Sequence, residues 1–237
     1  MHSVSQKPVM AAERVWLFDL DNTLHNAAVS SFRLLDAAMN DYIERELKVS
    51  AEEADRLRGH YWHRYGATLL GLMRHHGVKP AHFLHHTHLL PTLERDVATH
   101  PHDVAALQHL RGRKYILTNA PLAYAKRVLR QLGMLKYFDG VIGIEQMTMF
   151  GQWRPKPDAR MFRALAARLG VPPRRCVLVE DTLIHQKSAY AVGMRTVWMQ
   201  RWAKRGSHGP EVGVYLHRRP TYVCARISSL QQLRRLP

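Results

Sequence analysis

The chain has 237 residues, of which 46% are hydrophobic and 23% charged, a composition typical of a folded globular protein and not of a disordered or low-complexity one. No apolar run approaches the roughly 20 residues that cross a bilayer, and residues 1–10 lack the apolar stretch of a signal peptide. We therefore expect a cytoplasmic, unanchored protein with no membrane partner. Cys176 and Cys224 are too few for a disulfide framework or a four-cysteine zinc site, so both are expected to be buried thiols.

The net charge of +16 is unevenly distributed along the chain. Residues 25–100 carry nine basic and nine acidic residues, whereas residues 101–200 carry sixteen against six and residues 201–237 carry eight against one. A positive field of this kind attracts nucleic acid, an acidic membrane or a small anionic substrate, because long-range potential does not distinguish among them. Charge alone does not choose the partner.

The predicted elements begin with a short buried strand at residues 14–19, rich in bulky side chains and ending abruptly in polar residues. Apolar residues then recur at helical spacing over 30–47, and further helices are expected around 51–75 and 80–90. No strand pattern interrupts this interval, so residues 27–100 are expected to form an all-helical unit.

Strands and helices alternate in the second half of the chain. Strands are expected at 114–118, 140–144, 176–180 and 196–199, and helices at 122–132, 158–169 and 184–192. This alternation predicts an α/β fold with a doubly wound parallel sheet, in which ligands bind beyond the carboxyl ends of the strands. We expect a core of residues 1–26 and 101–200, a helical insertion of residues 27–100, and a basic, less regular C-terminal extension of residues 201–237.

Two aspartates, Asp19 and Asp21, follow the first strand at a spacing of two, and extended residues two apart face the same way. Two such charges about 4 Å apart repel by about 4 kcal/mol at an effective dielectric near 20, so they need a cation, a shared proton, or both. One interpretation is a magnesium-assisted site in which one carboxylate is a nucleophile and the other exchanges a proton with the leaving group. The other is a turn with solvated aspartates.

Polar residues at three later strand ends favour the first interpretation. Thr118 and Asn119 supply a hydroxyl and an amide that suit a phosphoryl oxygen. Lys156 stands between two prolines, which restrain the backbone around a possible phosphate-binding charge. Glu180 and Asp181 follow a buried apolar strand, where acids are costly unless they are paired or bind a hard cation such as Mg²⁺.

The ordered set Asp19-Leu-Asp21-Asn-Thr, Thr118, Lys156 and Glu180-Asp181 resembles the haloacid dehalogenase superfamily of phosphatases over roughly residues 14–200. The resemblance implies a HAD-like core with an inserted C1-type helical cap, and a Mg²⁺-dependent phosphomonoester hydrolase that works through an aspartyl-phosphate.

The same resemblance implies a role for each residue. Asp19 would be the nucleophile, Asp21 the general acid/base and Thr118 a ligand of the transferring phosphoryl group. Lys156 would offset the charge of that group and of Asp19. Asp181, Asp19 and the backbone carbonyl of Asp21 would hold Mg²⁺, with Glu180 helping directly or through water. His185 stands where many relatives carry Asn or Asp, and we interpret it as a helix-start residue beside the metal ligands.

The helical insertion bears on the substrate. Residues 61–72 combine aromatic side chains, a hydroxyl and glycines, which would suit a planar ring with polar edges. Together with residues 18–24 and the turn at residues 118–120, they resemble the pyrimidine 5′-nucleotidase branch. That resemblance implies UMP or CMP as substrate, with Tyr65, Thr68, Arg64 and Asn119 as contacts. The alternative is that the aromatic residues fill the insertion's own core.

Two other functions remain open. One is a capped phosphatase for another small ester, such as a sugar phosphate or phosphoglycolate. The other is a nucleic-acid-binding protein on a phosphatase scaffold, which the basic charge favours and the intact motifs oppose. We expect a small phosphorylated substrate and no nucleic-acid partner. The sequence does not fix the oligomeric state, although a monomer is favoured.

Overall fold

Six parallel strands form the central sheet of the computed structural model, which describes residues 14–90, 93–202 and 219–236. Across the sheet the order is β3-β2-β1-β6-β7-β8. The strands are β1 (Val15–Phe18), β2 (Arg113–Leu117), β3 (Gly140–Ile142), β6 (Cys176–Glu180), β7 (Arg195–Met199) and β8 (Ala225–Ile227). The predicted α/β fold with a parallel sheet is confirmed, and five of these strands fall within two residues of their predicted bounds.

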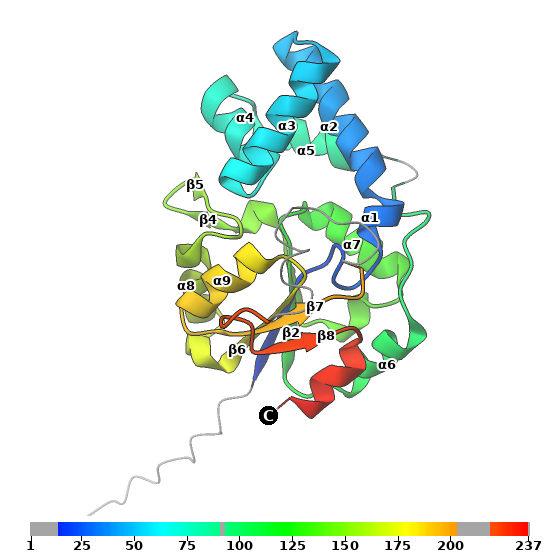
Figure 1. The fold of residues 1–237 in the computed structure, drawn as a ribbon, viewed down its shortest axis with the longest axis vertical. Helices are drawn as coiled ribbons and strands as arrows, with labels where there is room; N and C mark the ends of the chain where they lie inside the picture. The colour runs from blue at the N-terminus through cyan, green and yellow to red at the C-terminus, as the bar shows by residue number, and fades with distance from the viewer. Residues whose placement is uncertain (1–13, 91–92, 203–218, 237) are drawn as a thin grey trace, which may run out of the picture.

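Alternate side chains of β1 enter two different cores, as the period of two in a strand requires. Trp16 and Phe18 pack with α6 (Pro101–His109) and α7 (Leu122–Gln131), whereas Val15 and Leu17 pack with α8 (Ala159–Arg168) and α9 (Leu183–Ala191). Figure 1 shows the two helical layers on opposite faces of the sheet. Burial on both faces explains why β1 is apolar throughout.

A separate group of helices stands beyond the carboxyl ends of the strands (Figure 1). It comprises α1 (Ala27–Ser30), α2 (Phe32–Leu47), α3 (Ala51–Tyr65), α4 (Thr68–His76) and α5 (Pro80–His88). Within residues 27–90 and 93–100 the structure contains no strand, in line with the all-helical expectation. These helices bury a core of their own, including Tyr42, Ile43, Leu57, Leu72 and Phe83. We call residues 27–100 the cap.

The helix expected around residues 51–75 is broken into α3 and α4 at Gly66, which has φ +79°. This left-handed conformation ends α3, and glycine adopts it without the steric cost that a Cβ brings. An added Cβ would also lie 2.5 Å from Pro157 Cδ and 2.9 Å from the Lys156 carbonyl oxygen. The break therefore places the turn of the cap directly against the core segment that carries Lys156.

The C-terminal segment is more regular than predicted. Residues 225–227 form β8, which extends the sheet beside β7, and residues 230–235 form a 3-10 helix, η4. The buried Asp103 of α6 anchors this segment, because its carboxylate accepts hydrogen bonds from Ser229, Leu230 and Arg201. A strand of three residues is too short for a recognisable alternation pattern. The rest of the expected extension, residues 203–218 and 237, lies outside the described residues, as do residues 1–13 of the expected core.

Three smaller observations complete the fold. A hairpin of β4 (Thr148–Met149) and β5 (Gln152–Trp153), which the sequence did not indicate, precedes the Lys156 segment. Both cysteines are unpaired; Cys176 is buried as predicted, whereas Cys224 is only partly buried. Among the described residues, no helix combines the length and apolar character that spanning a membrane demands.

Candidate active site

The carboxyl edge of the sheet gathers the acidic motifs. Phe18 of β1 pairs with Ile116 of β2 and with Val179 of β6, so the residues that follow each strand emerge side by side. The Asp19 amide extends this register by donating to the Val179 carbonyl oxygen at 2.9 Å. Parallel pairing thus brings Asp19 next to Glu180, as expected for strand ends in a doubly wound sheet.

Lys156 lies at the centre of this group. Its Nζ donates to Asp19 Oδ1 and to Glu180 Oε2, each at 2.7 Å. The Lys156 side chain is 1% exposed, Glu180 1% and Asp19 8%. Charged groups at this depth are stable only when they are paired and hydrogen-bonded. The resemblance implied that Lys156 offsets the charge of Asp19, whereas its hydrogen bond with Glu180 was not expected.

Burial and charge oppose each other on these groups. Burial and the Glu180 charge raise the pKa of Asp19 to about 7, although Lys156 favours its ionised form. Burial alone would raise the pKa of Glu180, but Lys156 and His185 hold it well below its usual range. Burial, and then the Glu180 and Asp19 charges, raise the pKa of Asp181 well above its ordinary value. One lysine therefore does not balance the charge of all three carboxylates when they are ionised, which is why Asp19 and Asp181 retain protons more readily than usual.

The donor set fits a divalent cation. Single carboxylate oxygens of Asp19, Glu180 and Asp181 all lie within 4.8 Å of one another. Oxygen ligands are those that Mg²⁺ prefers, and its charge would relieve the repulsion that raises the pKa of Asp181. Of the expected ligands, the structure brings these three side chains together. The carboxylate of Asp21 is engaged by Tyr124 and His25, and the expected contribution of its backbone carbonyl stays a prediction.

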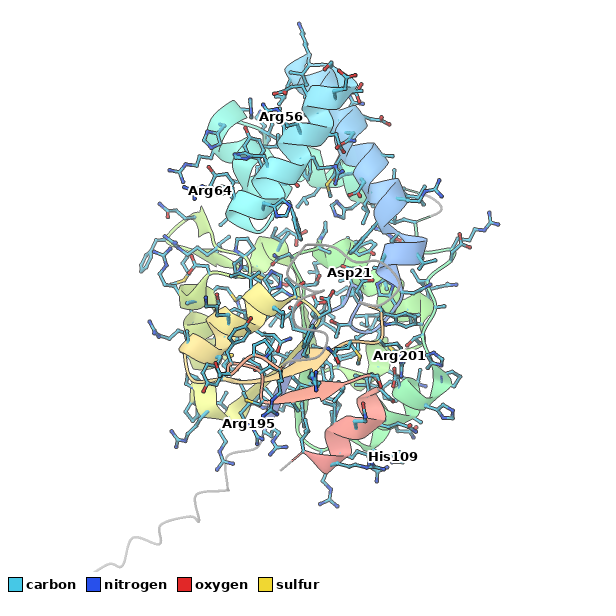
Figure 2. The ribbon with its side chains drawn as sticks, viewed as in Figure 1. Asp21, Arg56, Arg64, His109, Arg195 and Arg201 are labelled. Carbon is cyan, nitrogen blue, oxygen red and sulfur yellow. The ribbon has the colours of Figure 1, made fainter. Side chains whose placement is uncertain are left out.

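The Asp21 side chain has two neighbours. Its Oδ1 accepts a hydrogen bond from the Tyr124 hydroxyl at 2.9 Å, and His25 Nε2 lies 3.0 Å from the same oxygen. Asp21 is 17% exposed, whereas Tyr124 and His25 are buried completely. In Figure 2, Asp21 stands at the end of the core that faces the cap. Of the two expected catalytic carboxylates, Asp21 is therefore the more accessible one.

Thr118 and Asn119 follow β2 at the same edge. Thr118 is 1% exposed, and its Oγ1 accepts a hydrogen bond from the Ala120 amide at 3.0 Å. The Asn119 side chain accepts from the Lys156 amide at 3.0 Å and donates to the Lys156 carbonyl oxygen at 2.8 Å. It also lies 3.4 Å from the Gly66 carbonyl oxygen of the cap. Asn119 thus holds the Lys156 segment in place, and its direct contact with a substrate stays a prediction.

His185 lies in α9 beside the acidic group. Its Nδ1 is 3.2 Å from Glu180 Oε2 but does not meet hydrogen-bond geometry, and the ring is mostly buried. Burial lowers the pKa of His185, while the Glu180 charge acts in the opposite direction. The expected place of His185 near the start of a helix and next to a candidate metal ligand matches the structure.

Of the three cap candidates, Thr68 and Tyr65 make contacts within the cap itself and Arg64 is exposed. Thr68 is buried, and its hydroxyl donates to the Arg58 carbonyl oxygen at 3.0 Å. The Tyr65 hydroxyl lies 2.6 Å from His75 Nε2, and Arg64 is exposed on α3 (Figure 2). Contact of these three residues with a substrate stays a prediction.

Three residues next to the candidate site were not singled out from the sequence: His25, Tyr124 and the buried His88, whose ring packs edge-on against that of Tyr124 with centroids 5.9 Å apart. The only signal for His25 was its position four residues after Asp21. Nothing in the helical pattern of residues 122–132 distinguished Tyr124 from an ordinary core residue.

The chain matches two family models and resembles several solved structures. A model described as haloacid dehalogenase-like hydrolase matches residues 14–190, more than half of the chain, and a HAD-hydrolase-like model matches residues 153–230. Among solved structures, a HAD phosphatase from Thermococcus onnurineus is 23% identical, with a TM-score of 0.58 over 94% of this chain and 96% of that one. CbbY from Rhodobacter sphaeroides in complex with phosphate is 18% identical, with a TM-score of 0.62 over 93% and 96%. At these identities the likeness concerns the fold.

Curated relatives match over parts of their length. Phosphate metabolism protein 8 of Saccharomyces cerevisiae is 23% identical over 77% of this chain and 60% of its own length. Fructose-1-phosphate phosphatase YqaB of Escherichia coli is 34% identical over 40% and 48%, and a phosphoglycolate phosphatase of Cereibacter sphaeroides is 32% identical over 43% and 47%. The chain therefore spans about half to three fifths of these relatives. The fold, the strand-end motifs and the extent of the family match lead to one conclusion: the chain belongs to the haloacid dehalogenase-like hydrolase family.

Proposed function

We propose that this protein is a divalent-metal-dependent phosphomonoester hydrolase in which Asp19 attacks phosphorus and Asp21 carries the proton. The observation that supports the proposal most strongly is the buried Lys156 that holds Asp19 beside Glu180 and Asp181. The names of the curated relatives, which include two kinds of phosphatase, support it as well.

The proposed reaction has two steps. An Asp19 oxygen forms a bond to phosphorus as the ester P–O bond breaks, and Asp21 gives a proton to the departing oxygen. A water oxygen then forms a bond to phosphorus as the bond between phosphorus and Asp19 breaks, one of the water protons goes to Asp21, and phosphate is released. In each step one bond to phosphorus forms as another breaks. Asp21 gives a proton in the first step and regains one in the second, so it serves both.

Lys156 and Thr118 would assist by charge and hydrogen bonding. Lys156 Nζ, already 2.7 Å from Asp19, would offset the negative charge that the phosphoryl group brings, and the Thr118 hydroxyl would donate to one of its oxygens. Asp19, Asp181, Glu180 and the Asp21 carbonyl would hold Mg²⁺, which when bound supplies positive charge to the phosphoryl oxygens.

The pyrimidine 5′-nucleotides UMP and CMP are the substrates that we place first. The support is the aromatic and hydroxyl content of residues 61–72, where Tyr65 directly precedes the turn of the cap at Gly66. Gly66 contacts both Asn119 and the Lys156 segment, so Tyr65 is the cap candidate next to the catalytic edge. A base between cap and core would meet an aromatic ring there.

A sugar phosphate or phosphoglycolate is the second candidate. It is favoured by the fructose-1-phosphate and phosphoglycolate phosphatases among the relatives, and by the commitment of Thr68 to packing within the cap. Both candidates share the chemistry at Asp19 and differ only in what the cap recognises.

A substrate panel separates these candidates. Phosphate release is measured with Mg²⁺ on UMP, CMP, AMP, fructose 1-phosphate and phosphoglycolate. A preference of at least about tenfold in kcat/KM for UMP and CMP supports the nucleotidase, since tenfold corresponds to about 1.4 kcal/mol of selective binding. Equal or reversed rates remove the nucleotidase and leave the phosphatase. Release from none of the esters, with retention of RNA instead, overturns the proposed hydrolase.

A further inference from the structure

The carboxyl group of Asp21 is held through one of its two oxygens. Both Tyr124 Oη, at 2.9 Å, and His25 Nε2, at 3.0 Å, address Oδ1. His25 belongs to the loop that leaves β1 toward the cap, whereas Tyr124 comes from α7, 103 residues after Asp21. Two separate parts of the chain thus converge on a single oxygen of the expected proton carrier.

Both neighbours are arranged as donors. The Tyr124 hydroxyl is buried and lies 2.9 Å from Asp21 Oδ1, where a phenol O–H donates to a carboxylate oxygen. His25 Nδ1 is buried without a hydrogen-bond partner. A proton there would be a buried donor without an acceptor, so the imidazole favours the tautomer with its proton on Nε2, facing Asp21.

The Tyr124 ring is itself fixed in place. It packs edge-on against His88, whose Nδ1 lies 2.7 Å from the Thr87 hydroxyl. Arg127 donates to the His88 carbonyl oxygen and pairs with Glu94 at 2.6 Å. Contacts around His88 thus hold the Tyr124 ring in place with its hydroxyl next to Asp21.

We propose that Tyr124, assisted by His25, is a positioning residue that keeps Asp21 Oδ1 engaged so that the transferred proton always sits on Oδ2. This proposal rests on the proposed function, in which Asp21 is the acid and base. Two donors at Oδ1 exclude a proton from that oxygen and fix the rotation of the carboxyl group. The Oδ2 proton moves to the departing ester oxygen in the first step, and Oδ2 takes a proton from the attacking water in the second.

The test compares two leaving groups in the variant Tyr124→Phe, which keeps the ring and removes the hydroxyl. Rapid-quench measurements with Mg²⁺ follow formation of the phosphoenzyme and its hydrolysis. We use the best alkyl ester of the substrate panel and p-nitrophenyl phosphate, whose phenolate leaves without a proton. With the alkyl ester, formation should slow about tenfold, the lower range for a hydrogen bond to a charged group.

The rates with p-nitrophenyl phosphate and of phosphoenzyme hydrolysis distinguish a positioning role from a general loss of activity. With p-nitrophenyl phosphate, phosphoenzyme formation should stay within about twofold of wild type, because the general acid contributes little to that departure. Hydrolysis of the phosphoenzyme should slow about tenfold after either ester, since the same Asp21 oxygen activates water. A variant that merely loosened the fold would slow phosphoenzyme formation from both esters alike.

Two further variants serve as controls. Tyr190→Phe makes the same change on the exposed surface of α9, where the side chain is 47% exposed, and should leave all rates unchanged. His25→Gln keeps a nitrogen donor and His25→Leu removes it, so the glutamine variant should show the smaller loss with the alkyl ester. If Tyr124→Phe does not fold, this pair of His25 variants decides the matter.

Equal slowing of phosphoenzyme formation from both esters, or no slowing with the alkyl ester, overturns the positioning role. Failure of the proposed function gives a different result, because wild type would then form no phosphoenzyme from either ester.

Discussion

Lys156 Nζ and Asp19 Oδ1 lie 2.7 Å apart, although 137 residues separate them in the sequence. Lys156 Nζ also donates to Glu180 Oε2 at the same distance, so one buried lysine links the end of β1 to the end of β6. Replacing it leaves buried carboxylates without a partner, which costs more than an intact ion pair contributes.

We predict that Lys156→Met loses about 3–5 kcal/mol of unfolding free energy in chelator, the usual cost of removing one partner of a buried ion pair. Mg²⁺ should restore part of this loss by supplying charge to the same carboxylates. Urea denaturation with EDTA and with Mg²⁺ measures both effects, and Lys187→Met, at an exposed position of α9, is the control. Equal stability of Lys156→Met and wild type in EDTA would contradict the account.

Metal binding should strengthen as pH rises. Without metal, burial and the charges of Glu180 and Asp19 raise the pKa of Asp181 well above its ordinary value, so a bound cation must displace a proton. The increase in melting temperature that Mg²⁺ produces should therefore be larger at pH 8 than at pH 6, and small in Asp181→Asn at both. A shift that is independent of pH in wild type would refute this expectation.

Substitution of two glycines with similar backbone angles distinguishes the effect of backbone strain from that of a clash with the core. Gly66 and Gly77 both end cap helices, with φ +79° and +64°, and the left-handed backbone by itself makes an alanine at either position cost about 1 kcal/mol of stability. Only at Gly66 would the new Cβ meet the core, 2.5 Å from Pro157 Cδ; at Gly77 nothing lies within 4 Å. Gly66→Ala should therefore lower kcat/KM at least about tenfold and Gly77→Ala should not, because displacement of the catalytic segment costs rate steeply. Similar kcat/KM values for the two variants would argue against a catalytic contact at Gly66.

His88 should make the fold sensitive to acid. Burial lowers the pKa of His88 from 6.5 to about 4, so the unfolded chain binds its proton more readily than the native protein does. The contribution of neutral His88 to the free energy of unfolding is fully present above about pH 6.5. It decreases by up to about 3 kcal/mol as pH falls toward 4. In His88→Asn the unfolding free energy should depend less on pH across this window, as measured by urea denaturation at several pH values. An unchanged pH dependence would show that His88 is accessible to protons in the native state.

The sequence was sufficient to predict which acidic residues meet at the edge of the sheet, because these residues sit at strand ends. Apolar runs such as residues 176–179 mark buried strands, and in a parallel sheet the polar residues that follow them converge. The approach of Asp19, Glu180 and Asp181 follows from this rule alone. The contact of Lys156 with Glu180 depends on where a long side chain ends, which residue spacing does not specify.

Other features depend on tertiary contacts that leave little trace in the sequence. Helical periodicity continues through Gly66, so the break between α3 and α4 was not predicted, although the glycine is needed for the left-handed turn. The three residues of β8 are recognisable as a strand only beside β7. Tyr124 has the spacing of a core residue, and its hydroxyl acquires a role only because Asp21 lies next to it in space.

The most direct test of the account is a search for the covalent intermediate on Asp19. Asp21→Asn, which should slow hydrolysis of the intermediate more than its formation from p-nitrophenyl phosphate, is mixed with that ester and Mg²⁺, quenched in acid and analysed by peptide mass spectrometry. We predict one phosphoryl group on the peptide that contains Asp19, none when Asp19 is also changed to Asn, and loss of wild-type turnover by at least about 10³-fold in Asp19→Asn. Full turnover by Asp19→Asn, or a phosphoryl group on another residue, would contradict the central claim.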